Sequence, residues 1–72
     1  MPTKPALFDI VALKTEVDED GLHRGDRGTI VELLPDGRFV VEFDNEDDTP
    51  RAVTSLDAEQ IDVVWIGTAH AR

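Results

Sequence analysis

A Pro-Asp-Gly tripeptide between two apolar runs is the feature of the sequence that most constrains the fold. Residues 25–34 and 38–43 are rich in β-branched and aromatic side chains, and Pro35, Asp36 and Gly37 separate them. Such runs around a short turn sequence are typical of a β-hairpin. Pro35 and Asp36 suit the central positions of a type I turn, and Gly37 can take the positive φ of a closing bulge. The segment therefore predicts two antiparallel strands.

The three-residue loop also predicts which residues of the hairpin face each other. Leu33 is expected opposite Phe39, and Val31 opposite Val41. The face that carries these pairs is apolar and the other face is mixed, as in a half-buried sheet. We therefore expect one buried cluster on this face, made of Val31, Leu33, Phe39, Val41 and Phe43. Ile10 or Val11 of an earlier strand is expected to join it.

The rest of the chain divides into short elements. Residues 7–13 are almost continuously apolar and predict a first strand, followed by a long loop over 14–24 in which Leu22 is expected to plug the end of the core. Residues 51–56 predict an edge strand, 57–60 one 3₁₀ turn that begins near Asp57, and 61–66 a last strand. Residues 1–6 and 67–72 are expected to be flexible termini around a single domain over 7–66.

This order of elements predicts an all-β fold, a small five-stranded SH3-like β-barrel with one short 3₁₀ turn. The OB-fold is the competing architecture, but it usually needs a longer chain and a full helix before its fourth strand.

Composition limits the classes of function. The chain has 72 residues and no cysteine, which excludes disulfides and thiolate metal sites. Its apolar runs are far shorter than the ~20 residues of a membrane span, and its start does not resemble a signal peptide, so we expect a cytoplasmic protein without a membrane partner. The net charge of −9 disfavours nucleic acid and favours a basic protein partner, although solubility alone is the alternative explanation.

The acidic side chains gather in two segments that the core does not require, 16–20 and 42–48. Loops on a small rigid domain are where binding residues usually lie. The second segment lacks the ligand alternation of a calcium loop, so we expect no metal and no cofactor. The candidate partner-binding residues are Glu16, Asp18, Glu19, Asp20, Asp44, Glu46, Asp47 and Asp48.

Other candidate sites are weaker. His23 and His70 lack a neighbouring second ligand or nucleophile, and no glycine-rich phosphate loop is present, so we expect no enzyme activity. Trp65 is expected to pack in the core or at the end of the barrel rather than to form a binding platform. Arg24 and Arg27 are expected to pair with Asp18, Glu19 or Asp20.

Three segments of the chain resemble a known sequence pattern. Phe8 to Leu13 resembles D-x-V-A-L, Gly21 to Glu32 resembles G-L-x-x-G-D-x-G-T-I-V-E, and Val41 to Phe43 resembles V-E-F. This is the pattern of a small bacterial family, the domain of unknown function numbered 4926, and the resemblance covers residues 7 to 62. It implies an SH3-like fold, no catalytic residues, and antitoxin-like or accessory partners of neighbouring proteins. Residues 25–33 are also similar to the KOW motif of ribosome and transcription factors.

We therefore expect a non-enzymatic module that binds a basic protein. A KOW-like module on RNA, ribosome or transcription complex is one alternative, and a structural accessory domain of an enzyme complex is another. Self-association into a homo-oligomer stays open.

Overall fold

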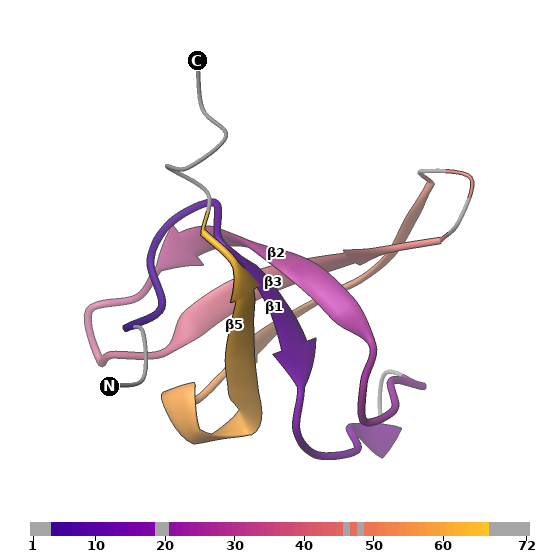
Figure 1. Cartoon of the computed structure of the whole chain (residues 1–72), viewed down its shortest axis with the longest axis horizontal. Helices are drawn as coiled ribbons and strands as arrows, with labels where there is room; N and C mark the ends of the chain where they lie inside the picture. The colour runs from indigo at the N-terminus through magenta and orange to yellow at the C-terminus, as the bar shows by residue number, and fades with distance from the viewer. Residues whose placement is uncertain (1–3, 19–20, 46, 48, 67–72) are drawn as a thin grey trace.

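The computed structural model describes residues 4–18, 21–45, 47 and 49–66. Five strands within them form one antiparallel sheet in the order β4-β3-β2-β1-β5 (Figure 1). The elements are β1 (Ile10–Leu13), β2 (Arg27–Leu33), β3 (Phe39–Asp44), β4 (Pro50–Leu56), the 3₁₀ helix η2 (Ala58–Gln60) and β5 (Ile61–Trp65).

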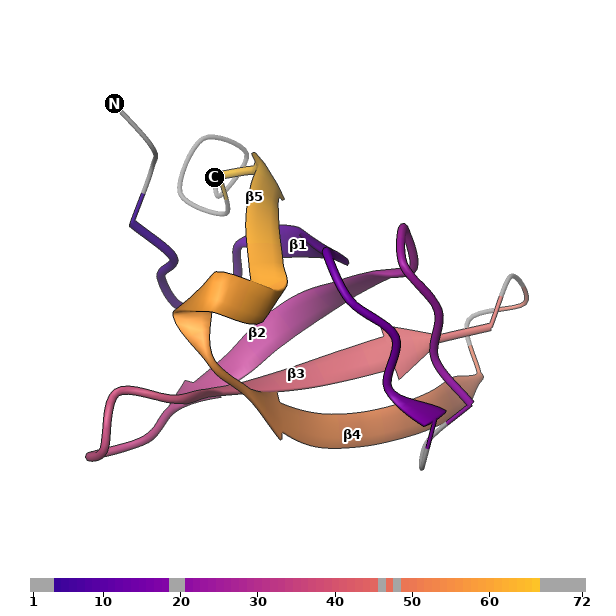
Figure 2. The ribbon, with the colours of Figure 1, turned by 90° about the horizontal axis from the view of Figure 1, so that it is seen from below.

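The sheet is open, so the expectation of a closed barrel is wrong, while the all-β class and the 3₁₀ turn are confirmed. The end strands β4 and β5 each pair with one neighbour, β3 and β1, and not with each other. Figure 2 shows η2 carrying the chain away from β4, so that β4 and β5 diverge. Closing a barrel requires the two end strands to pair with a fixed stagger, and β4 and β5 do not pair.

The hairpin between β2 and β3 has the predicted turn. The amide of Gly37 donates to the carbonyl of Leu34 at 3.0 Å, and the amide of Leu34 donates to the carbonyl of Arg38 at 2.9 Å. Gly37 has φ 89°, a conformation that favours glycine. The side chain of Asp36 accepts a hydrogen bond from the amide of Arg38 at 3.0 Å. Local turn chemistry therefore decides where this hairpin reverses.

A bulge in β2 overturns part of the predicted face. Leu33 pairs with Phe39 as expected, but Ile30, not Val31, pairs with Val41, because the register shifts between Ile30 and Glu32. Val31 is the extra residue and turns outward, while Ile30 turns into the core.

Leu33 is exposed for a different reason from Val31. The strand β1 pairs with β2 only as far as Thr29, so the hairpin end projects beyond the strand that would cover it (Figure 2). Val31 and Leu33 consequently have 40% and 50% of their surface exposed, and the prediction that they are buried is wrong.

The core lies on one side of the sheet and draws on every strand. Phe39, Val41, Phe43 and Val11 are buried as predicted, whereas Ile10 is only half-buried. The full cluster is Val11, Leu13, Leu22, Ile30, Phe39, Val41, Phe43, Leu56 and Ile61.

Two local features anchor the ends of this core. Leu22 is fully buried, and its backbone pairs with Val17 to pin the long loop, which confirms its predicted role as a plug. At η2, the backbone amide of Asp57 donates to the side chain of Gln60 at 2.9 Å. Asp57 therefore begins the turn, as the sequence predicts.

The first strand begins later than predicted, because residues 6–9 form a turn. The amide of Asp9 donates to the carbonyl of Ala6 at 3.1 Å, and the buried carboxylate of Asp9 accepts the amide of Ala6 at 2.9 Å. This turn places Phe8 at φ 71°, an uncommon conformation for a bulky residue, with its ring largely exposed.

Within the part of the chain that the structure describes, no helix has the length and apolar character needed to cross a membrane.

Candidate functional site

The long loop before β2 presents acidic side chains to solvent. Glu16 and Asp18 are exposed, whereas Glu19 and Asp20 lie outside the described residues. Because Leu22 anchors this loop in the core, the exposed carboxylates sit on a segment that is tied to the sheet at both ends.

The loop between β3 and β4 presents the second set of acidic side chains to solvent. Asp44 and Asp47 are exposed, and Glu46 and Asp48 lie outside the described residues. Asp47 accepts hydrogen bonds from the hydroxyl of Thr49 at 2.6 Å and from its amide at 3.1 Å. These two bonds hold the pKa of Asp47 below its ordinary value of 3.8, and the bond from the hydroxyl has the larger effect. The Thr49 hydroxyl in turn accepts from the side-chain amide of Asn45 at 3.0 Å.

Arg51 joins the two loops. It is the extra residue of a bulge in β4, since Phe43 pairs with Ala52 and Asp44 with Pro50. Its guanidinium lies 3.3 Å from Asp26 and donates to the carbonyl of Gly21 at 2.6 Å. Both loops therefore lie on the same side of the molecule, at the right of Figure 2.

Of the three predicted partners of Arg24 and Arg27, Asp18 is described, whereas Glu19 and Asp20 lie outside the described residues. Among the described residues, no ion pair joins Arg24 or Arg27 to Asp18, and Arg24 instead donates to the carbonyl of Lys14 at 3.0 Å. The sequence signal for the observed pair is weak, because Arg51 and Asp26 are distant in the chain and meet only through the bulge.

The described residues hold no group of three or more side chains suited to bind a metal ion. The exposed imidazole of His23 lies 3.6 Å from Glu16, and His70 lies outside the described residues.

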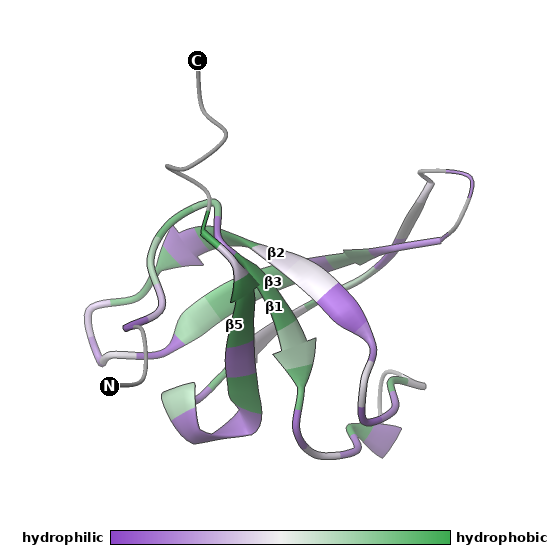
Figure 3. Cartoon of the chain, in the orientation of Figure 1, coloured by the Kyte–Doolittle hydropathy of each residue, from purple (hydrophilic) through white to green (hydrophobic). Residues whose placement is uncertain are grey.

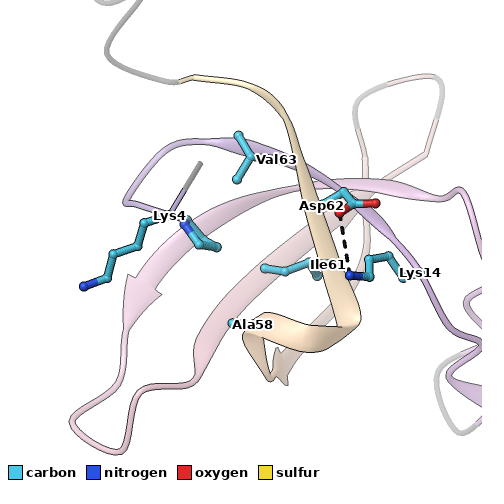
Figure 4. Close-up of a pocket in the computed structure, with 7 residues that line it drawn as sticks. Lys4, Lys14, Ala58, Ile61, Asp62 and Val63 are labelled. Carbon is cyan, nitrogen blue, oxygen red and sulfur yellow. Dashed lines mark ion pairs between the residues drawn. The ribbon is translucent and has the colours of Figure 1, made fainter. Parts of the chain in front are cut away.

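A shallow groove of about 400 Å³ runs between the N-terminal segment, η2 and β5 (Figure 4). Lys14 lies 3.7 Å from Asp62, which offsets its charge. The amine of Lys4 extends away from this pair in Figure 4. The two lysines thus do not converge on one point, and the groove lacks the focused charge that would hold an anion.

The face of the sheet opposite the core carries a row of side chains that the sequence did not predict. Successive pairings align one residue from each strand, and we call these five residues the outer row: Trp65, Ile10, Thr29, Glu42 and Val53. The apolar parts of β1 and β5 lie next to each other in Figure 3. Trp65 and Val53 are 53% and 56% exposed, so the expectation that Trp65 packs in the core is wrong.

The architecture defines a small all-β domain with one open antiparallel sheet and acidic loops on one side. The chain belongs to the family described as "Domain of unknown function (DUF4926)", whose model matches residues 7–63. No curated protein and no solved structure matches the chain.

Proposed function

We propose that this domain is a non-enzymatic module, antitoxin-like or accessory, that binds a protein with a basic surface. One observation carries the proposal: exposed carboxylates from two separate loops lie on the same side of the molecule, joined by Arg51. Arg51 offsets only part of this charge, because Glu16, Asp18, Asp44 and Asp47 remain exposed on the two loops.

Such a surface acts mainly on the rate of association. Clustered charge of one sign on a protein of net charge −9 attracts a basic partner before contact, and salt removes that attraction. The two-loop arrangement favours a partner whose basic residues form a patch, because both loops can be engaged together.

We also infer an open variant of the SH3-like arrangement, acting in the cytoplasm. The SH3-like inference is supported by the order of strands along the chain and by the 3₁₀ turn between the last two strands. The location is supported by the absence of cysteine.

The test compares two variants that lose equal charge. The loop variant carries Asp44→Asn and Asp47→Asn, and the control carries Asp36→Asn and Glu59→Gln, on exposed residues outside both loops. Proteins retained from a lysate of the native cell at low salt are identified, and the association rate of each purified candidate is then measured.

The loop variant should slow association at low salt by roughly threefold or more, and high salt should abolish the difference. The control should associate at nearly the wild-type rate. Equal rates for the two variants would contradict the proposal. Tighter binding of a single-stranded RNA by the loop variant, with unchanged protein association, would favour the KOW-like alternative.

A further inference from the structure

We propose that the outer row is a second contact surface, which binds a protein segment that places one lysine or arginine between apolar side chains. The inference rests on the proposed function, because it names the chemistry of the partner segment, but it concerns a different face from the acidic loops. It starts from Glu42, whose surroundings differ from those of the loop carboxylates.

Glu42 is a half-buried residue and the fourth of the five in the row, with Thr29 on one side and Val53 on the other. Its side chain makes no hydrogen bond or ion pair within the described residues. Its carboxylate oxygens stay in contact with solvent, since no buried side-chain oxygen lacks a partner among the described residues. An incoming cation can therefore reach this carboxylate and form a charge-assisted hydrogen bond with it.

The neighbours of Glu42 supply apolar contact area. Ile10 and Trp65 lie two and three strands away on the same face, and the whole row crosses four strand spacings, about 19 Å. Trp65 and Val53 stand exposed at its two ends. A buried charge pair flanked by an exposed tryptophan and aliphatic groups is the composition of a typical binding hot spot.

The edges of the sheet are less suited to binding than this face. Both end strands carry a bulge, at Arg51 in β4 and at Val64 in β5, as the register shifts show. Bulges twist an edge and interrupt its row of hydrogen-bonding groups, which disfavours the addition of a partner strand. Side chains of the outer row are therefore the better contact.

A second copy of this chain is the poorer occupant. Two outer rows placed face to face would bring together two chains of net charge −9 each, and neither row offers a cation to the Glu42 carboxylate of the other. Charge complementarity instead selects a cationic segment.

The experiment uses a displayed library of random linear peptides as the probe, selected on the wild-type protein at physiological ionic strength. Selected peptides are synthesised and titrated against the wild type, Glu42→Gln and Glu59→Gln. The last variant is a matched control, because Glu59 is an exposed glutamate in η2, away from the row. Trp65 is the single tryptophan of the chain, so its emission reports directly on coverage of the row.

We expect the selected peptides to share a lysine or arginine flanked by apolar residues and to shift Trp65 emission to shorter wavelengths. Glu42→Gln should weaken their binding about tenfold, as expected for loss of one charge-assisted hydrogen bond, and Glu59→Gln should not. Glu42→Lys should reverse the preference toward peptides with a glutamate at that position.

Four results would overturn the inference. These are a selection without enriched peptides, enriched peptides without a cation, an unchanged Trp65 emission, and equal affinity for Glu42→Gln and Glu59→Gln. Sedimentation of the wild type as a dimer that buries Trp65 would assign the face to self-association instead. Titrating the Asp44→Asn and Asp47→Asn variant with the same peptides separates the two proposals, since the outer row should bind them unchanged even if the acidic loops bind nothing.

Discussion

Arg51 and Asp26 are joined across the molecule, with Nη1 of the arginine 3.3 Å from Oδ2 of the aspartate. The same guanidinium donates to the carbonyl of Gly21, at the end of the first acidic segment. One bulged residue of an edge strand therefore holds the long loop against the start of β4.

Arg51→Gln should lower the free energy of unfolding by about 1 kcal/mol, because an exposed ion pair contributes little and the bond to Gly21 adds a similar amount. The matched control is Arg27→Gln, since Arg27 is exposed and makes no side-chain contact of this kind within the described residues. Denaturant melts at low and high salt measure both. A loss no greater than that of Arg27→Gln would mean that the bridge does not stabilise the loop.

The bulge in β2 predicts opposite outcomes for two adjacent residues. Ile30→Ala should cost about 2–5 kcal/mol, because Ile30 is fully buried and its loss leaves a cavity. Val31→Ala should change stability by about 0.5 kcal/mol or less, because Val31 is partly exposed. Thermal denaturation of the two variants tests the register directly. The reverse order would indicate the unbulged hairpin.

Two glycines should respond differently to the same substitution. A Cβ on Gly28 would lie 2.7 Å from Cγ1 of Val41 and 2.8 Å from the carbonyl oxygen of Glu42, so backbone must move. Gly28→Ala should therefore cost about 1–3 kcal/mol through overpacking. Gly37→Ala meets no atom within 4 Å and should cost about 1 kcal/mol, from its positive φ alone. Equal losses in chemical denaturation would argue against the close approach of β2 and β3 at Gly28.

The loop between β3 and β4 predicts a pH effect at Asp47. Hydrogen bonds from Thr49 lower its pKa below 3.8, so the folded state favours the ionised form. This contribution to stability is present above the ordinary pKa and disappears as the pH falls through the lowered value. Thr49→Val removes the hydroxyl bond and keeps the amide bond, and should raise the pKa of Asp47 part of the way back. An NMR titration of the Asp47 carboxyl carbon in the wild type and in Thr49→Val measures this. A pKa unmoved by the substitution would show that the hydroxyl does not act on Asp47.

Local chemistry in the sequence determined the hairpin turn, the 3₁₀ turn and the approximate strand segments. Pro35, Asp36 and Gly37 act on their own backbone angles and on hydrogen bonds within four residues, so no distant contact is needed to place the turn. The burial of Leu22 was equally readable, because an isolated apolar residue in a polar loop needs a core to cover it.

Tertiary structure decided the bulge in β2, the open sheet and the exposure of Trp65. Each depends on how far one strand extends beside another, and that length is set by partners far apart in the sequence. The bulge turns Val31 outward, and β1 stops pairing with β2 at Thr29, which leaves Leu33 uncovered, although the pattern of both residues is that of a buried face. The outer row exists for the same reason, since its five residues come from five strands and align only through the register of the whole sheet.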